Sequence, residues 1–236
     1  MCNRIIAQSI AITAHHTQER RSGEPYINHP LRVADMAEHL FQYDPHAATV
    51  ATLHDVLEDS VYTTETLQLL GFNEKIVDAV VLLTREKGLS RGDYIQRILE
   101  STNTTALRVK LLDAIDNSTW SYLDRDSKKP DLWCVKRKYY RQLAERLHAR
   151  LCELDPQVPT KLMPMVIYTW NQMDRLSLKE FARAHGDRST SHYHIGCTHP
   201  HTAIINDNQY FDDTWEVDLF EGIHCDDYVL SILAEG

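Results

Sequence analysis

Short helix-forming segments, separated at close intervals by capping residues and turns, fill the first 186 residues, and this pattern constrains the fold most strongly. After Pro30, the apolar residues Leu31, Ala34, Ala37 and Leu40 recur at a spacing of three, which places them on one face of a helix. Similar patterns recur up to residue 185. The sequence therefore predicts an all-α bundle of about seven to nine helices, over residues 30–41, 46–60, 64–71, 74–87, 94–101, 104–123, 132–153 and 160–185.

Residues that commonly cap helices stand near the starts of these segments. Asp44, Thr63 or its neighbour, Asn73, Asp93 or its neighbours, and Asn103 carry side-chain oxygens that can accept hydrogen bonds from the free N–H groups of a first turn. Glycines at positions 71 and 88 follow two of the segments, as they do after many helices. Local signals therefore bound several of the predicted helices.

The end of the chain differs from the rest in charge and composition. Residues 187–236 contain ten acidic residues and one basic residue, whereas residues 1–186 contain 24 of each sign. The stretches TAII and TWEVDLF have the composition of strands. We therefore expect two units, a helical domain over residues 1–186 and an acidic, histidine-rich appendage of strands and loops over residues 187–236.

Within this appendage, the stretch SHYHIGCTHPHT brings four histidines and one cysteine close together. Such density permits a zinc site. The irregular spacing instead favours a polar, partly ordered segment, and a dimer arm or a lid over the active site is a third interpretation.

Charge and cysteine content exclude several classes of protein. A formal net charge of −9 argues against a general nucleic-acid-binding protein, because affinity for phosphate backbones needs dense lysine and arginine. The sequence shows no secretory leader and no apolar run of about 18 residues, so we expect a soluble, cytoplasmic protein without a membrane partner. The five cysteines are scattered and include no CxxC pair, which indicates reduced thiols.

The stretch LHDVLEDS, residues 53–60, carries the first chemically informative pattern. On a helix, His54 lies one turn before Glu58 and Asp55 one turn before Asp59, so four ionisable groups interrupt an otherwise apolar segment. Burial of these groups is unfavourable unless a metal ion compensates their charge. One imidazole and one carboxylate suit Mn²⁺, Fe²⁺ or Zn²⁺. For this stretch alone, a solvated acidic face remains the alternative.

A second helical stretch, VKLLDAIDNST, residues 109–119, combines acids with core residues. Asp113, Asp116 and Asn117 share one face, with Lys110 one turn earlier. One carboxylate here could complete a metal site begun by His54-Asp55, whereas a capping or surface cluster is the alternative interpretation.

Three stretches together resemble a known family. AHHTQERRSGEPYINHP, TLHDVLEDS and VKLLDAIDN follow one another in the order and spacing of the HD-domain hydrolases of the RelA/SpoT type, in particular the stand-alone small alarmone hydrolases that include the metazoan SpoT homologue. The resemblance covers about residues 1–150. It implies an HD-domain helical bundle with a small nucleotide as substrate, and it leaves a homodimer open.

The resemblance implies a single divalent cation, usually Mn²⁺, held by His29, His54, Asp55 and Asp113. Two imidazoles and two carboxylates agree with the ligand preference argued above. It also implies that two acidic residues lie beside the metal and activate or orient the attacking water, and between them we favour Glu58 over Asp59 as the base.

Arg20, Arg21 and Ser22 match the basic, nucleotide-facing loop of the family. A guanidinium can stack on a base or bind a phosphate through two hydrogen bonds, whereas an exposed basic pair before a turn would be the ordinary interpretation. Lys110 and Asn117 correspond to contacts on the phosphate and nucleotide side.

The family reaction is hydrolysis of the 3′-pyrophosphate of (p)ppGpp to pyrophosphate and GDP or GTP. Related enzymes act on adenine alarmones such as ppApp or remove the 2′-phosphate of NADPH, and both remain alternatives for this chain. A catalytically silent nucleotide sensor is a third alternative, although such a protein would not need Glu58 and Asp59.

The sequence departs from the family pattern beside the expected substrate pocket. Asp116 stands where relatives commonly have His or Tyr, so its carboxylate either points away or is compensated by a cation. Trp120 could stack on a base, but we expect it to fill the core. We expect Pro30 to hold His29 in an extended conformation and to start the following helix.

Overall fold

The computed structural model describes residues 2–20, 23–120 and 132–185, and these form ten helices. No strand occurs among them; a single bridge joins Glu19 and Pro25. The all-α prediction is confirmed for these residues, whereas the predicted appendage over residues 187–236 lies outside them. The helices are α1 (Cys2–His15), α2 (Asn28–Leu40), α3 (Ala47–Leu53), α4 (Val56–Asp59), α5 (Thr64–Leu69), α6 (Glu74–Leu83), α7 (Arg91–Glu100), α8 (Thr104–Trp120), α9 (Leu132–Leu154) and α10 (Leu162–His185).

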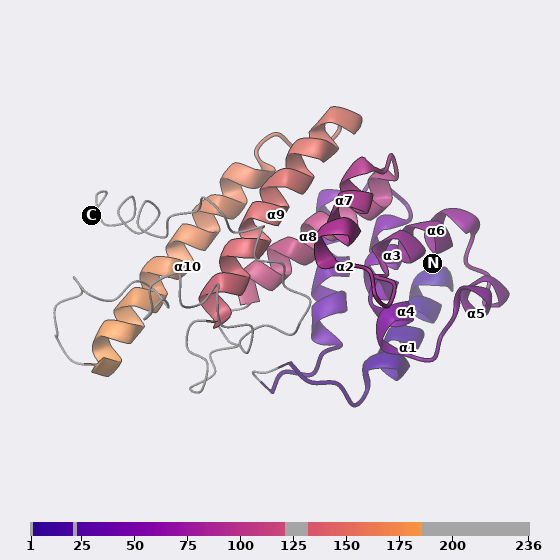
Figure 1. The fold of residues 1–236 in the computed structure, drawn as a ribbon, viewed down its shortest axis with the longest axis horizontal. Helices are drawn as coiled ribbons and strands as arrows, with labels where there is room; N and C mark the ends of the chain where they lie inside the picture. Colours follow the sequence, from indigo (N-terminus) through magenta and orange to yellow (C-terminus); the bar gives the residue numbers. More distant parts are fainter. Residues whose placement is uncertain (1, 21–22, 121–131, 186–236) are drawn as a thin grey trace.

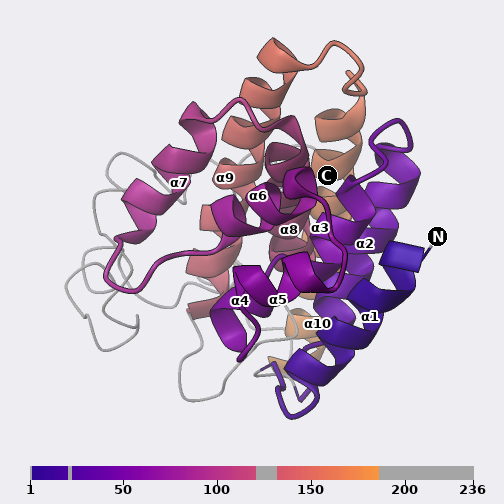
Figure 2. The same ribbon diagram turned by 90° about the vertical axis from the view of Figure 1, so that its right-hand side faces the viewer.

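Helix α8 runs through the middle of the bundle. It packs against α9 on one side and against α2, α3 and α6 on the other, and α10 lies beside α9 (Figures 1 and 2). Most residues of α8 from Ala106 to Ser118 are buried, including charged ones. A helix enclosed on all faces needs no single apolar stripe, because every face meets protein. Charged side chains on α8 must therefore find partners inside the bundle.

Three of the predicted caps are confirmed. The side chains of Thr63, Asn73 and Asn103 accept hydrogen bonds from the N–H groups of Thr66, Ile76 and Ala106 at the starts of α5, α6 and α8. Glycines at 71 and 88 have positive φ angles of 88° and 91°, which side chains with a Cβ rarely adopt. These local signals place helix boundaries because each acts within one turn of the chain.

Other predicted boundaries are wrong. Helix α1 is an additional element that the sequence did not predict. Helix α6 ends at Leu83 instead of residue 87, and the cap of α7 is Ser90, three residues before Asp93. The side chain of Asp44 accepts from the N–H of His46 outside α3, whose N-cap is His46 itself.

The predicted helix over residues 46–60 is interrupted. His54 and Asp55 form a bend between α3 and α4, with Asp55 at φ −100° and ψ −3°. This interruption turns out to shape the candidate site. Within the described ranges, no helix combines the length and the apolar character that a membrane span requires.

Candidate metal centre

Four side chains from three separate parts of the bundle converge behind its surface. His54 Nε2 lies 2.9 Å from Asp55 Oδ2, and His29 Nε2 lies 3.8 Å from the same oxygen. One ligand atom from each of these three residues lies within 4.8 Å of the others. Asp113 Oδ1 lies 3.1 Å from His29 Nε2 and 3.8 Å from His54 Nε2. The structure thus brings together the four residues that the sequence resemblance implies as metal ligands.

The bend between α3 and α4 explains how two adjacent residues face the same point. On a regular helix, neighbouring side chains point about 100° apart. The predicted pairing of His54 with Glu58 and of Asp55 with Asp59 assumed such a helix, and the helix does not continue through His54 and Asp55. Because the chain bends here, His54 and Asp55 direct their donor atoms into one site.

His29 lies in the first turn of α2, and the expected extended conformation is wrong. Helix α2 begins at Asn28, and the N–H of His29 donates to the carbonyl of Tyr26 at 2.9 Å. Pro30 therefore stands inside the first turn and not at its first position. Its missing N–H costs no hydrogen bond there, because the first four N–H groups of a helix have no intrahelical partner.

Hydrogen bonds at the far side of each imidazole orient both rings. His29 Nδ1 donates to Asp116 Oδ2 at 2.7 Å, and His54 Nδ1 donates to the carbonyl of Ala51 at 2.7 Å. In the neutral ring, a proton on Nδ1 leaves a lone pair on Nε2. Both lone pairs then point toward the carboxylates of Asp55 and Asp113.

His54 Nε2 is buried without a hydrogen-bond partner among the described residues, although Asp55 Oδ2 lies 2.9 Å away. A neutral imidazole and a carboxylate both present acceptors at this point, so they repel unless a positive charge lies between them. This charge can be a proton on the ring or a cation. The geometry therefore favours binding of a positive ion.

Shifted pKa values also indicate that the cluster favours a positive charge. Burial alone would lower the pKa of His29, but the hydrogen bonds and charges of Asp113 and Asp116 raise it to about 9. The pKa of His54 is also raised, because Asp55 and Asp113 outweigh the effect of burial. The pKa values of Asp55 and Asp113 are lowered by the imidazoles, and for Asp113 also by Lys110, despite burial. Without a metal, the site thus favours protonated imidazoles, and a cation can replace these protons.

Neighbouring side chains hold the two carboxylates. Tyr26 donates its hydroxyl to Asp55 Oδ2 at 2.7 Å. Lys110 Nζ lies 2.9 Å from Asp113 Oδ2, and the side-chain amide of Asn117 donates to Asp113 Oδ1. Tyr26 was not predicted as a site residue, although it stands in the SGEPYI motif. The motif indicates a turn but not the direction of this hydroxyl.

The structure describes three of the five expected nucleotide-binding residues, Arg20, Lys110 and Asn117. Arg20 Nη2 donates to Asn117 Oδ1 at 2.9 Å, so Asn117 links this arginine to Asp113. Gly23, at φ 82°, turns the chain between Arg20 and α2. Arg21 and Ser22 lie outside the described residues. Lys110 and Asn117 are brought into the site, where Lys110 contacts Asp113 and Asn117 accepts from Arg20.

Glu58 and Asp59 stand at the end of α4, and both are exposed. The carboxylate of Glu58 accepts from the backbone N–H of Arg85 at 3.2 Å. Partial loss of solvation, together with the charges of Asp55 and Glu58, raises the pKa of Asp59 to about 6. Both carboxylates are therefore accessible to water, and Asp59 lies near enough to Asp55 and His54 to interact with their charges.

Asp116 points inward and is compensated by cations, which settles the alternative left by the sequence. It is 2% exposed and accepts two hydrogen bonds from Arg32, from Nε at 2.8 Å and from Nη2 at 3.0 Å. Arg32 in turn lies 4.7 Å from the ring centre of Trp120, which is half-buried. Arg32 was missed in the sequence, although it follows His29 by three residues and so shares its face of α2.

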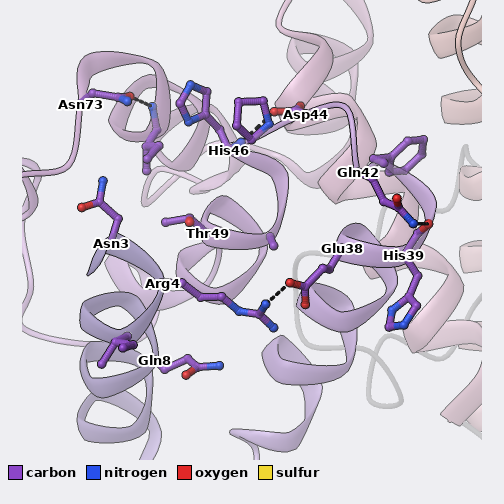
Figure 3. Close-up of a pocket in the computed structure, with 15 residues that line it drawn as sticks. Asn3, Arg4, Gln8, Glu38, His39, Gln42, Asp44, His46, Thr49 and Asn73 are labelled. Atoms are coloured by element: carbon purple, nitrogen blue, oxygen red, sulfur yellow. Dashed lines mark hydrogen bonds and ion pairs between the residues drawn. The ribbon is translucent and has the colours of Figure 1, made fainter. Parts of the chain in front are cut away.

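A groove of about 990 Å³ lies at the opposite ends of α1, α2 and α3 from this cluster (Figure 3). Across it, Arg4 on α1 points toward Glu38 on α2 and forms an ion pair with it. The side chain of Asn73 at its edge caps α6. These polar side chains therefore have structural partners, and we assign the groove no chemistry.

The donor set of the cluster fits a divalent cation. Two imidazole nitrogens and two carboxylate oxygens suit Mn²⁺, Fe²⁺ or Zn²⁺, and each imidazole is oriented by a second hydrogen bond, as is usual for metal-binding histidines. His54 Nε2 is buried without a hydrogen-bond partner among the described residues, and a bound cation would satisfy it. His29, His54, Asp55 and Asp113 are the residues that would hold the ion.

Comparisons with known proteins identify sequence relatives of this chain. A guanosine-3′,5′-bis(diphosphate) 3′-pyrophosphohydrolase of Haemophilus influenzae is 36% identical over 146 residues, which are 58% of this chain and 21% of that protein. A protein of the same name from Aquifex aeolicus is 32% identical over 148 residues, 60% of this chain and 21% of that protein. A GTP pyrophosphokinase of Streptomyces coelicolor is 30% identical over 131 residues, 52% of this chain and 15% of that protein. The chain thus spans about a fifth or less of the length of these relatives.

A solved structure shows the same fold. It is described as a metazoan orthologue of SpoT that hydrolyses ppGpp, and it matches with a TM-score of 0.59 and 21% identity, over 72% of this chain and 95% of that one. The family model for the HD domain matches residues 7–149, which include all four cluster residues. The chain therefore belongs to the HD domain family.

Proposed function

We propose that this protein is a metal-dependent hydrolase that removes the 3′-pyrophosphate of an alarmone nucleotide, converting (p)ppGpp to GDP or GTP and pyrophosphate. One observation carries the proposal: His29, His54, Asp55 and Asp113 meet in one largely buried cluster, whose donor atoms favour a bound cation. The two pyrophosphohydrolases that share the segment add support from relatives. Some relatives are named pyrophosphokinases, but water-accessible carboxylates beside a metal-type cluster favour hydrolysis.

Mn²⁺ is the metal that we propose: the mixed imidazole and carboxylate ligands suit Mn²⁺, Fe²⁺ or Zn²⁺, and the family resemblance favours Mn²⁺ among them. A bound divalent cation would neutralise phosphate charge and lower the pKa of a water molecule. His29 and His54 would bind through Nε2, while Tyr26 holds the carboxylate of Asp55 in place. These residues thus prepare the site without taking part in proton transfer.

Proton transfer falls to the exposed carboxylates. In the hydrolysis, water forms a bond to the phosphorus next to the ribose 3′ oxygen, the bond from that oxygen to phosphorus breaks, and the oxygen takes up a proton. Glu58 is the base that we favour for the proton of the attacking water, with Asp59 as its neighbour. General-base catalysis of this kind contributes roughly 10²–10⁴-fold to a rate.

Positive side chains would bind the phosphates and the base. Arg20 is largely buried, with a side chain 9% exposed, and its Nη1 lies 3.5 Å from Asp116 Oδ2 without a hydrogen bond to any described residue. A guanidinium held in this way can bind a phosphate oxygen or stack on a base. With Arg21, Ser22, Lys110 and Asn117 it makes up the substrate-binding set that we propose.

A substrate panel tests the proposal. Metal-free protein is reloaded with Mn²⁺ and incubated with ppGpp, ppApp and NADPH, and the products are separated by anion exchange. Pyrophosphate and GDP from ppGpp are the expected products. Faster cleavage of ppApp, or phosphate released from NADPH, would move the protein to one of the alternative substrates, and no turnover of any nucleotide would contradict an enzymatic function.

The cytoplasmic location, a homodimer and the independence from nucleic acid stay predictions of the sequence.

A further inference from the structure

The buried carboxylate of Asp116 stands directly behind one of the presumed metal ligands. Its Oδ2 accepts the Nδ1 proton of His29 at 2.7 Å, on the side of the ring away from Asp55 and Asp113. Asp116 is 2% exposed and His29 is 1% exposed. Water therefore cannot readily replace this hydrogen bond, and the orientation of the ring depends on the protein alone.

Arginine side chains surround the same carboxylate. Arg32 donates to both oxygens of Asp116, and Arg20 Nη1 lies 3.5 Å from Oδ2. Glu24 also accepts from Arg32, so that arginine is held from two sides. Asp116 is therefore fixed in position, because rotation of its side chain would break several charged hydrogen bonds at once.

Trp120 restricts Arg32 from a third direction. The guanidinium carbon lies 4.7 Å from the centre of the indole ring, a distance at which a cation interacts favourably with an aromatic face. Trp120 follows Asp116 by four residues, so both lie on one face of α8. The order of contacts runs from Trp120 to Arg32, to Asp116 and to His29.

We propose that Asp116 is a positioning residue that holds His29 with Nε2 directed at the bound metal, and that Arg32 and Trp120 hold Asp116 in turn. A carboxylate that accepts the second N–H of a metal-binding histidine fixes the ring and makes the other nitrogen a better ligand. The inference rests on the proposed metal site but not on the identity of the nucleotide.

A purely structural role predicts a different result. As a structural ion pair, Asp116 with Arg32 would stabilise the contact between α2 and α8 and leave the affinity for metal unchanged. As a positioning residue, it changes the affinity for metal even in a variant that stays folded. Metal binding in the absence of nucleotide therefore separates the two roles.

The experiment titrates metal-free protein with Mn²⁺ in a calorimeter and compares wild type with Asp116→Asn. The amide keeps the size of the side chain but loses the charge and one acceptor. Removal of such a partner typically weakens metal binding roughly 10- to 100-fold, and we expect a loss of that size. Asp116→Glu restores the charge and is expected to recover part of the affinity. Asp35→Asn, an exposed acid on the same helix as His29, is the matched control and is expected to bind as wild type does.

Arg32→Gln provides a second test if Asp116→Asn fails to fold. It leaves Asp116 and His29 in place but removes the arginine that holds them, so we expect a smaller loss of affinity. Wild-type affinity in a folded Asp116→Asn, or in Arg32→Gln where the first variant cannot be obtained, would overturn the proposal.

The titration contains no nucleotide, which keeps this result separate from the proposed reaction. Wild-type protein that binds Mn²⁺ but cleaves none of the tested nucleotides would contradict the proposed function alone.

Discussion

Helix α8 carries two buried charged clusters, and they differ in whether their buried polar atoms all find hydrogen-bond partners among the described residues. In its first half, Arg108 forms ion pairs with Asp44 and Asp155. Asp44 also accepts a hydrogen bond from Thr105 Oγ1 at 2.7 Å, and Asp155 accepts one from the hydroxyl of Tyr43 at 2.9 Å. In its second half, Asp113 faces two imidazoles, and one of their nitrogens has no hydrogen-bond partner within the described part of the chain.

The difference separates a cluster with a structural role from the metal site that we propose. Around Arg108, one guanidinium lies between two carboxylates, and the backbone N–H of Gln157 adds a further donor to Asp155 at 3.0 Å. Around Asp113, Lys110 and Asn117 also contact the carboxylate. His54 Nε2, which lies 3.8 Å from Asp113 Oδ1, has no hydrogen-bond partner among the described residues. Burial of charge alone therefore does not distinguish the two clusters, whereas the buried nitrogen of His54 without a hydrogen-bond partner among the described residues does.

The largest expected effect comes from removing a presumed ligand. Asp55→Ala is expected to lose metal binding, and nucleotide turnover is expected to fall by roughly 10³-fold or more, because the stabilisation of phosphate charge is worth several kcal/mol. Metal content and turnover of the same preparation measure both. Asp78→Ala, at an exposed position of α6, serves as the control. An Asp55→Ala protein with bound metal and full turnover would place the chemistry elsewhere.

Breaking the other cluster is expected to affect stability instead of chemistry. Arg108→Ala leaves Asp44 and Asp155 buried without their cation, and loss of one partner from a buried ion pair costs about 3–5 kcal/mol. Urea unfolding measures this loss. The folded fraction should still bind Mn²⁺ with wild-type affinity, and weakened metal binding would show that the two clusters are not independent.

A smaller effect on turnover is expected at the accessible carboxylates. Glu58→Gln should retain the metal and lose roughly 100-fold in the rate of the chemical step, the lower end of what a general base contributes. Asp59→Asn is its matched comparison, and we expect the smaller loss there. Single-turnover rates with Mn²⁺ bound measure both, and the reverse order would assign the base to Asp59.

The smallest effect concerns the pH dependence of stability. Burial alone would raise the pKa of Asp155, but hydrogen bonds from Arg108, Gln157 and Tyr43 hold it below its ordinary value of 3.8. A lowered pKa in the folded state stabilises the protein above about pH 4, and this contribution is lost as the pH falls through the folded-state pKa. Asp155→Asn should therefore be less stable at pH 7 by about 1–2 kcal/mol, with a difference that shrinks toward pH 3. An equal difference at both pH values in urea unfolding would argue against this assignment.

The sequence predicted most of the elements and the four presumed ligands, but not their orientation. Caps at Thr63, Asn73 and Asn103 were predictable because the physical cause lies within one turn. The bend at His54 and Asp55 was not, since neither glycine nor proline marks it in the sequence.

Partners between separate elements escaped prediction for the same reason. Tyr26 reaches Asp55 from the turn before α2, and Arg32 reaches Asp116 from another helix. The sequence indicated that a carboxylate at position 116 needs a cation, but only the packing of α2 against α8 identifies it as Arg32 together with His29.

Proton release on metal binding tests the central claim most directly. The cluster should hold protons when no metal is bound, because the pKa of His29 is raised to about 9. A metal must then displace a proton from Nε2. Calorimetric titration with Mn²⁺ at pH 7, in two buffers of different ionisation enthalpy, measures the number of protons released. We predict one ion per chain with release of about one proton or more, and tighter binding as the pH rises toward 9. Binding without proton release, or no binding at all, would contradict the account.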